Sequence, residues 1–260
     1  MNAIKKICML VLLTLVPALA IAGGEGVQLD KAPVNLHDQA SLQRGAKLFT
    51  SRCLACHAAS YMRYNRLHDI GMSDEQIKAE LELPEDVKVG STMQAAMDSN
   101  SAKLAYGVAP PDLSVIARSR SADWLYTYLR SFYADENRPS GWNNTVFPNV
   151  GMPFVLADLQ GELVVETVQH EGYDIKKLLL KTPGSMQPAE YDSAVADLTN
   201  YLVFMGEPAK LVRHQIGWIV LGFLFILFLL LYALKKESGA TCIERIEFKG
   251  RFVVICAPVS

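Results

Sequence analysis

Long apolar runs lie near both ends of the chain and indicate how it is divided into segments. Residues 7–21 read ICMLVLLTLVPALAI, and residues 216–234 read IGWIVLGFLFILFLLLYAL. The second run contains no charged residue and is close to the roughly 20 apolar residues with which a helix crosses about 30 Å of hydrocarbon. It also lacks the polar residues at helical spacing that a buried core helix would carry. This run therefore predicts a transmembrane helix.

The first run has the three parts of a secretory signal. Lys5 and Lys6 precede it, and the small residues of Ala20-Ile21-Ala22 end it. This pattern predicts a signal peptide at residues 1–22. An uncleaved membrane anchor is the alternative, and either segment would export the residues that follow.

Basic residues flank the predicted transmembrane helix unequally. Lys210 and Arg213 precede it, whereas five basic residues follow it, namely Lys235, Lys236, Arg245, Lys249 and Arg251. Because basic residues concentrate on the cytoplasmic side, we expect a bacterial inner-membrane protein with a cytoplasmic C-terminus. The predicted parts are a signal peptide (1–22), a periplasmic domain (23–212), an anchor helix (213–236) and a cytoplasmic tail (237–260).

Between the two runs, three segments show helical patterns. Residues 41–52 have apolar positions at helical spacing, Ser121–Phe132 begins with a residue suited to a cap, and further helical signals run from Pro188 to Gly206. A polar, acidic stretch lies between Asp69 and Asp98, and the other loops are rich in Pro, Gly and Asn. No clear sheet pattern is present. The chain is therefore expected to be mainly α, with long loop insertions and one C-terminal transmembrane helix.

Charge and cysteine content narrow the possible functions. The chain has 25 basic and 27 acidic residues, which gives no reason to expect a nucleic-acid partner. Of its five cysteines, Cys8 belongs to the predicted signal, and Cys242 and Cys256 lie in the predicted cytoplasmic tail. The exported domain therefore keeps Cys53 and Cys56.

Residues 53–57 read CLACH, and several kinds of site share the CxxC spacing. A thioredoxin-like dithiol follows a strand, whereas the residues before Cys53 have helical spacing. A structural zinc site needs four ligands, and the sequence has no second CxxC or close His pair. A single disulfide is the simplest alternative in an exported chain. C-x-x-C-H is instead typical of c-type haem attachment.

The spacing suits one covalently attached haem c. Residues i and i+3 of a helical turn project to the same side, so the thiols of Cys53 and Cys56 can add to the two vinyl groups of one porphyrin. The adjacent His57 can then coordinate the iron. We therefore predict that these three residues hold the cofactor.

Residues on either side of the motif strengthen this interpretation. Gly45 and Phe49 precede it, and Tyr201 and Leu202 lie near the end of the exported domain. They resemble residues of the two crossing helices in small monohaem cytochromes c, where a glycine lets an aromatic residue and a leucine approach closely. The resemblance implies a cytochrome c-like haem domain.

Longer segments are similar to the cytochrome c1 family, the haem subunits of cytochrome bc1 complexes. In order, they are Tyr61-Met62-Arg63-Tyr64, Ala109-Pro110-Pro111-Asp112-Leu113-Ser114 followed by Arg118 and Arg120, Phe147-Pro148-Asn149-Val150-Gly151-Met152-Pro153, and the C-terminal anchor. The resemblance runs from about residue 35 to about residue 236. The tail at 237–260 does not resemble the family's ending.

This resemblance implies an electron carrier that is not an enzyme by itself. Electrons would arrive from a Rieske iron–sulfur protein and leave to a soluble or membrane-tethered cytochrome c, within a dimeric membrane complex that also contains cytochrome b. One alternative is a membrane-anchored monohaem cytochrome c that serves a terminal oxidase or a nitrogen-oxide reductase. A haem peroxidase is disfavoured, because dihaem peroxidases carry two CxxCH motifs and this chain has one.

A second axial ligand is expected to be a methionine, since a thioether opposite histidine favours ferrous iron. Of the nine methionines, seven are set aside by position: two in the signal, two close behind His57, two in the acidic stretch and one on the last helix of the domain. Met152 and Met186 remain. Met152 lies in FPNVGMPF, where prolines prevent a regular helix and Gly151 lets the backbone approach a flat cofactor. This segment also resembles the family's ligand segment, so we predict Met152, with Met186 as the alternative.

Other cofactor contacts are carried over from the resemblance. The pair Pro110-Pro111 resembles a rigid wall against the haem edge. Arg120 is expected to pair with a haem propionate, because its planar donor fork suits a carboxylate, and Arg118 competes for this role. Tyr64 and Trp124 are expected to be walls of the pocket.

Overall fold

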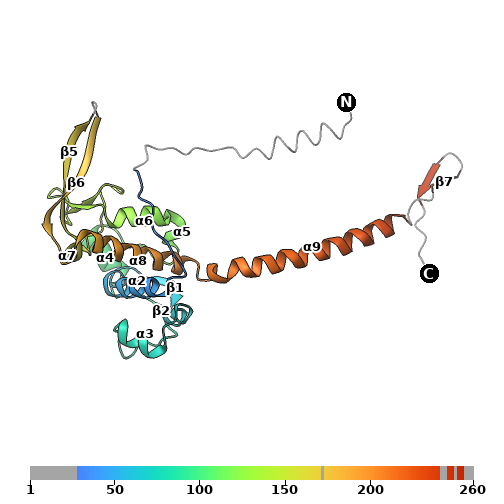
Figure 1. Ribbon diagram of the computed structural model, residues 1–260, viewed down its shortest axis with the longest axis horizontal. Coiled ribbons are helices and arrows are strands. Elements are labelled where there is room, and N and C mark those ends of the chain that lie inside the picture. The colour runs from blue at the N-terminus through green and yellow to red at the C-terminus, as the bar shows by residue number, and fades with distance from the viewer. Residues whose placement is uncertain (1–27, 171–172, 241–244, 249–250, 255–260) are drawn as a thin grey trace.

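The computed structural model describes residues 28–170, 173–240, 245–248 and 251–254 (Figure 1). The predicted signal peptide and much of the predicted tail lie outside these residues. The helices are α2 (Gln39–Arg52), α3 (Asp74–Glu80), α4 (Ser99–Tyr106), α5 (Ile116–Arg120), α6 (Ala122–Leu129), α7 (Ala157–Gln160), α8 (Pro188–Gly206) and α9 (Lys210–Ala240), with a 3-10 helix η1 (Tyr64–Ile70). The mainly α fold expected from the sequence is confirmed.

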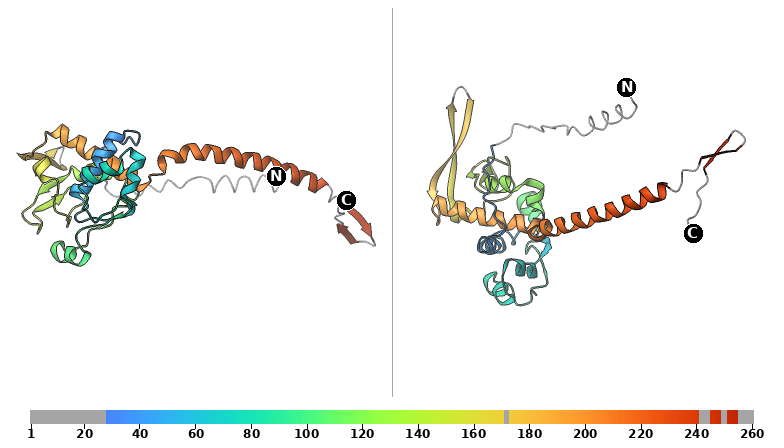
Figure 2. Two further views of the ribbon diagram at one scale, coloured as in Figure 1. Left: turned by 90° about the horizontal axis from the view of Figure 1, so that it is seen from below. Right: turned by 45° about the vertical axis from the view of Figure 1, so that its right-hand side comes forward.

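Within the described residues, four antiparallel strand pairs accompany the helices. They are β1 (Ala59–Arg63) with β2 (Thr92–Met93), β3 (Phe132–Ala134) with β4 (Trp142–Asn144), β5 (Gly161–His170) with β6 (Tyr173–Pro183), and β7 (Arg245–Phe248) with β8 (Arg251–Val254). The expectation that the chain has no clear sheet is wrong at β5 and β6, which form a long hairpin that extends away from the helices (Figure 2). Apolar residues follow one another in both strands there and pair as Leu163 with Leu180, Val164 with Leu179 and Val165 with Leu178. Because apolar and polar residues do not alternate, the segment lacks the strand signal.

The core forms where α2 crosses α8, as the resemblance to cytochromes c implied. A Cβ added to Gly45 on α2 would lie 2.1 Å from the carbonyl oxygen of Asp197 and 2.7 Å from the Cβ of Tyr201, so the two backbones are nearly in contact. The Phe49 and Tyr201 rings pack beside this point with centroids 5.6 Å apart, and both are fully buried. Arg44 and Asp197 close the exposed side with an ion pair of 2.6 Å. This crossing fixes the end of α2, where the CxxCH motif begins.

Helix α6 starts as the sequence predicts and ends earlier. The hydroxyl of Ser121 accepts a hydrogen bond from the backbone of Trp124, which is the expected cap. The helix ends at Leu129 rather than at Phe132, because Phe132 pairs with Asn144 in the β3–β4 ladder. The buried hydroxyl of Tyr191 donates to the Leu129 carbonyl and ties α8 to this end of α6.

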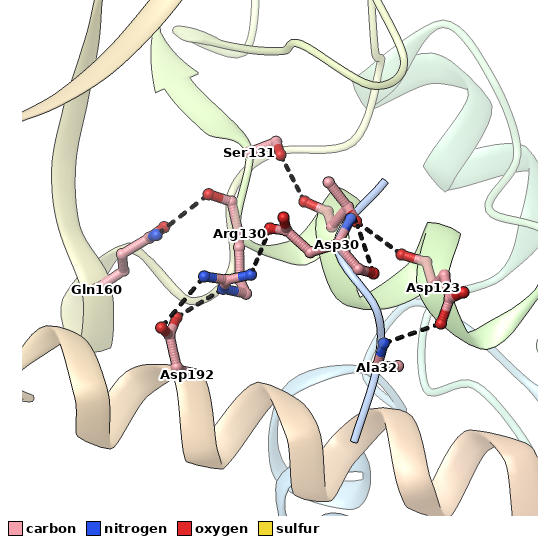
Figure 3. Close-up of polar contacts among 8 residues, drawn as sticks. Asp30, Ala32, Asp123, Arg130, Ser131, Gln160 and Asp192 are labelled. Carbon is pink, nitrogen blue, oxygen red and sulfur yellow. Dashed lines mark hydrogen bonds and ion pairs between the residues drawn. The ribbon is translucent and has the colours of Figure 1, made fainter. Parts of the chain in front are cut away.

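Arg130 joins the first described residues of the chain to α8 (Figure 3). Its guanidinium donates to both carboxylate oxygens of Asp192 at 2.6 and 3.1 Å, and to Asp30 at 2.7 Å. The backbone of Ala32 also donates to Asp123 on α6 at 2.8 Å. The segment before α2 is therefore held against both α6 and α8.

Helix α9 leaves the domain through a short connection. Residues 207–209 separate it from α8, and α9 then extends away from the domain with its apolar side chains exposed (Figures 1 and 2). It contains a span, Lys210–Lys236, that is long and apolar enough to cross a membrane. This span includes the transmembrane segment predicted from the sequence.

Candidate functional site

A cavity of about 400 Å³ opens beside the CxxCH motif. Its walls come from five parts of the chain: the end of α2 with the motif, residues 106–113, helices α5 and α6, residues 147–155, and α8 through Leu198 and Leu202. Most of the lining side chains are apolar, and the two charged ones, Arg52 and Arg120, are both basic. The volume falls within the roughly 300–1,000 Å³ of small-molecule and cofactor pockets.

The motif folds as a tight turn after α2. The carbonyl oxygen of Cys53 accepts hydrogen bonds from the backbones of Cys56 at 3.1 Å and His57 at 2.8 Å. This turn brings both thiols to the cavity, and they are free rather than joined in a disulfide. Burial raises the pKa of Cys53 to about 12, with a further increase from the nearby Cys56, so its sulfur is a neutral thiol at neutral pH.

His57 presents one ring nitrogen to the domain and leaves the other available. Its Nδ1 lies 2.8 Å from the carbonyl oxygen of Pro111, which can only accept, so Nδ1 donates. Burial lowers the pKa of His57, although the Pro111 hydrogen bond raises it, and the ring is therefore neutral at neutral pH. The Nε2 lone pair is then available to coordinate a metal. In metal sites, a hydrogen bond from the other ring nitrogen commonly fixes the orientation of the coordinating imidazole.

The double-proline segment is held in place by hydrogen bonds to β1. The backbone of Ser60 donates to one carboxylate oxygen of Asp112 at 2.9 Å, and Ser114 donates to the other at 2.8 Å. The backbone of Leu113 also donates to the carbonyl of Ala58 at 2.8 Å. These contacts fix the Pro111 carbonyl that orients His57.

Met152 lines the same cavity as His57. The hydroxyl of Tyr128 donates to its sulfur at 3.5 Å, and burial raises the pKa of Tyr128, so the hydroxyl stays protonated. Among the methionines in the part of the chain that the structure describes, Met152 is the one that lines the cavity. Met186, the alternative ligand, lies outside the lining and packs against the core.

Of the other residues predicted to contact the cofactor, all but one line the cavity. Pro110, Pro111, Arg120 and Trp124 line it, and the guanidinium carbon of Arg120 lies 5.2 Å from the Trp124 ring centroid. Tyr64 does not line the cavity. It follows β1 into the core, where it is buried, so its expected place at the cofactor stays a prediction.

Arg118 also lies outside the lining, unlike its competitor Arg120. A Cβ added to Gly206 would lie 3.5 Å from the Cγ of Arg118, so this arginine packs along the end of α8. Arg120, two residues later, is on the cavity side of α5. The structure thus separates the two arginines that the sequence left in competition.

Tyr128, Phe147 and Val150 line the cavity but were not singled out from the sequence. Tyr128 lies four residues after Trp124 on α6, and their rings stack with centroids 4.7 Å apart. Because residues i and i+4 share one face of a helix, this spacing could have identified Tyr128 once Trp124 was assigned to the pocket. Phe147 and Val150 lie in the segment predicted to carry Met152, but no signal distinguishes them from its other residues.

The lining fits a c-type haem. It supplies two thiols for covalent attachment, a neutral imidazole and a thioether, which are ligands that haem iron accepts in cytochromes c. Flat and apolar side chains surround these donors. The basic Arg120 is suited to an anionic edge of the cofactor.

Comparison with known proteins identifies the family. The model of the Cytochrome C1 family matches residues 30–171. The chain is 48% identical to a cytochrome c1 of Allochromatium vinosum over 238 residues, which cover 90% of this chain and 97% of the relative. It belongs to the cytochrome c1 family.

Two further relatives are similar to most of the chain. A protein of Nitrosomonas europaea named ammonia monooxygenase gamma subunit is 50% identical over 237 residues, covering 91% of this chain and 97% of the relative. The cytochrome c1 of Rhodospirillum rubrum is 26% identical over 263 residues, covering 84% of this chain and 92% of the relative. Membership of the cytochrome c1 family confirms the resemblance seen in the sequence and implies a haem c cofactor.

Proposed function

We propose that the chain is the electron-carrying haem subunit of a ubiquinol–cytochrome c reductase, the cytochrome bc1 complex. The single observation that carries this proposal is the gathering of Cys53, Cys56, His57 and Met152 around one apolar cavity in a chain of the cytochrome c1 family. The haem, when bound, supplies an iron that gains and loses one electron. The chain itself binds this group, orients it and excludes water.

Each donor has a separate task in this proposal. Cys53 and Cys56 would attach the cofactor through thioethers, and His57 and Met152 would supply the two protein ligands of its iron. With both ligands in place, little would rearrange on electron transfer and small oxidants would be excluded. The soft thioether favours the ferrous state, which raises the potential.

The remaining lining residues shape the pocket. Pro110 and Pro111 form a rigid wall, because a proline ring fixes its backbone. Trp124 adds a flat aromatic wall. Arg120 pairs with a propionate, and its position across Trp124 and Phe147 limits the freedom of its planar donor fork.

The proposed partners follow from the family and from the anchor. Electrons arrive from a Rieske iron–sulfur protein and leave to a soluble or membrane-tethered cytochrome c, in a dimeric complex that contains cytochrome b. Helix α9 anchors the chain in a bacterial inner membrane, with the haem domain in the periplasm and the C-terminus in the cytoplasm. The excess of basic residues after the anchor supports this orientation.

The name of the Nitrosomonas europaea relative does not change the proposal. That relative and the Allochromatium vinosum cytochrome c1 match nearly the same share of this chain. The CxxCH motif and the family model both agree with the name cytochrome c1. An oxidase or nitrogen-oxide reductase cytochrome is not favoured, since the family match covers the loops that line the cavity as well as the motif.

Covalent attachment is tested by extraction of denatured protein. The wild-type chain is expected to retain its haem through acid–organic extraction, because two thioether bonds hold it. Cys53→Ala should weaken this retention, whereas Cys256→Ala, which changes a cysteine of the tail, should not. The measurement is haem absorbance per chain after extraction. Free extraction from the wild type would contradict covalent attachment.

Assembly is tested by purification of the full chain from its native membranes in a mild detergent. A cytochrome b and a Rieske protein are expected to co-purify in proportion to the chain, and the preparation should reduce cytochrome c when supplied with a quinol. Mass spectrometry and haem spectra identify the subunits. Recovery with subunits of a terminal oxidase or a nitrogen-oxide reductase would instead support the alternative function.

A further inference from the structure

The segment that leads to Met152 is held by two adjacent buried asparagines at the end of β4, Asn143 and Asn144. We propose that Asn144 is a positioning residue for the axial methionine, which it acts on through Tyr128 and the backbone of residues 146–147. This inference rests on the proposed function, because it takes Met152 as an iron ligand. Neither the CxxCH motif nor the pocket lining identifies Asn144, which is not among the cavity residues.

Asn144 is fully buried and uses both ends of its amide. Its Nδ2 donates to the backbone carbonyl of Tyr128 at 2.8 Å. Its Oδ1 accepts from the backbones of Val146 at 2.8 Å and Phe147 at 3.0 Å. One side chain therefore joins the end of α6 to the loop that continues to Met152.

Asn143 continues this support along the loop. Its Oδ1 accepts from the backbone of Asn149 at 2.8 Å, and its Nδ2 donates to Asp135 at 2.8 Å. Asn149 has a φ of 63°, a left-handed conformation that asparagine tolerates better than most residues. Arg138 donates to the carbonyl of Asn149 at 3.0 Å and holds the same turn from outside. The chain direction three residues before Met152 is thus set by side chains rather than by a helix or a strand.

Tyr128 closes the connection to the ligand. Its backbone carbonyl accepts from Asn144, and its hydroxyl donates to the sulfur of Met152 at 3.5 Å. Asn144 therefore fixes both partners of this contact relative to each other, one through α6 and the other through the loop. Groups that bond a metal ligand directly orient that ligand, and their loss typically costs about 10-fold to 100-fold in metal affinity or activity. Tyr128 holds this place, and Asn144 acts one step further away.

The chain contains a matched control in Asn200. This asparagine on α8 is also buried and also makes three hydrogen bonds: its Oδ1 accepts from the backbone of Asn35, and its Nδ2 donates to the Asn35 carbonyl and to Ser41. None of these three residues lines the cavity. Truncating Asn144 or Asn200 therefore removes the same number of side-chain hydrogen bonds from the fold, but only Asn144 is connected to Met152.

The test compares Asn144→Ala, Asn144→Asp and Asn200→Ala in the full chain, purified with its haem in mild detergent. Asn144→Ala should retain the covalent haem, weaken the near-infrared sulfur-to-iron band of the oxidised protein, lower the midpoint potential, and allow carbon monoxide to bind to the reduced protein, which the wild type does not. Asn144→Asp, which still accepts from Val146 and Phe147, should be intermediate. Asn200→Ala should lower the unfolding temperature and leave the band and the potential unchanged.

The inference is overturned if Asn144→Ala has the band and the potential of the wild type, or if Asn200→Ala shifts them equally. If Asn144→Ala does not accumulate, Asn144→Asp is compared with Asn200→Ala instead. If the band and the potential of Asn144→Asp equal those of Asn200→Ala, the inference is overturned. Met152→Leu separates this result from the proposed function. A wild-type band in Met152→Leu rejects the ligand itself, whereas loss of the band in Met152→Leu with no effect of Asn144 rejects only the positioning role.

Discussion

Replacing Met152 with leucine is expected to abolish the sulfur-to-iron charge-transfer band of the oxidised protein. Leucine has nearly the same volume as methionine but no donor atom, so the iron would lose its proposed second ligand while the cavity wall stays filled. The midpoint potential should fall by on the order of 100 mV, part of the roughly 0.8 V over which axial ligands tune haem. The reduced protein should also bind carbon monoxide. Near-infrared spectra, redox titration and carbon monoxide difference spectra check these effects.

Two other methionines provide controls for this substitution. Met93 is fully buried and accepts a hydrogen bond from the hydroxyl of Tyr201 at 3.5 Å, which is the same type of contact that Met152 makes with Tyr128. Met186 is the ligand candidate that lies outside the cavity. Neither Met93→Leu nor Met186→Leu should change the band or allow carbon monoxide to bind. Loss of the band in Met186→Leu, with retention in Met152→Leu, would reverse the assignment.

Gly45→Ala is expected to destabilise the domain by about 3 kcal/mol or more, since overpacking a close contact typically costs about 1–3 kcal/mol and this contact involves rigid backbone. The added methyl group would lie 2.1 Å from the Asp197 carbonyl oxygen. Alanine normally stabilises a helix by about 1 kcal/mol relative to glycine. The expected loss of stability is therefore opposite to what helix propensity alone would give. For a domain of this size the unfolding temperature should fall by on the order of 10 °C.

Thermal unfolding of the purified holoprotein, followed by circular dichroism, measures this effect. Gly90→Ala is the control, because a Cβ at Gly90 meets no atom within 4 Å. It should change stability by less than about 0.5 kcal/mol, as surface substitutions usually do. An unchanged unfolding temperature in Gly45→Ala would contradict the close packing of α2 on α8.

Helices were predictable from the sequence where one face is apolar and the ends carry local signals. The segment Pro188–Gly206 is helical with the predicted bounds, because Pro188 suits the first turn and the apolar positions recur at helical spacing. The helix before Cys53 was also expected, with Asp38 as a cap that the sequence did not reveal. The predicted helix at 121–132 was too long, since pairing between strands overrides local preference at Phe132.

The site was predictable where covalent chemistry fixes the spacing, and less so where tertiary contacts decide. Cys53, Cys56 and His57 are adjacent in sequence, so their joint place at the cavity follows from one turn. Tyr64 lies only seven residues after His57, yet its direction depends on β1 and the core, so proximity in sequence does not bring it to the cavity. Asn144 could not be found in this way, because its hydrogen bond to Tyr128 becomes apparent only when α6 and β4 are brought together, although its bonds to Val146 and Phe147 are local.

The connection between α8 and α9 determines which molecules must move during electron transfer. Residues 207–209 can span at most about 10 Å when extended, and here they form turns, with Lys210 donating to the Glu207 carbonyl and Arg213 to the Ala209 carbonyl. Leu211 packs against the core, and Arg213 pairs with Glu207. The domain is therefore joined to α9 by a short connection rather than by a long linker. A carrier held close to its anchor depends on movement of its donor and its acceptor toward it. Motion of those partners, rather than travel of this chain, would then limit the rate of encounter.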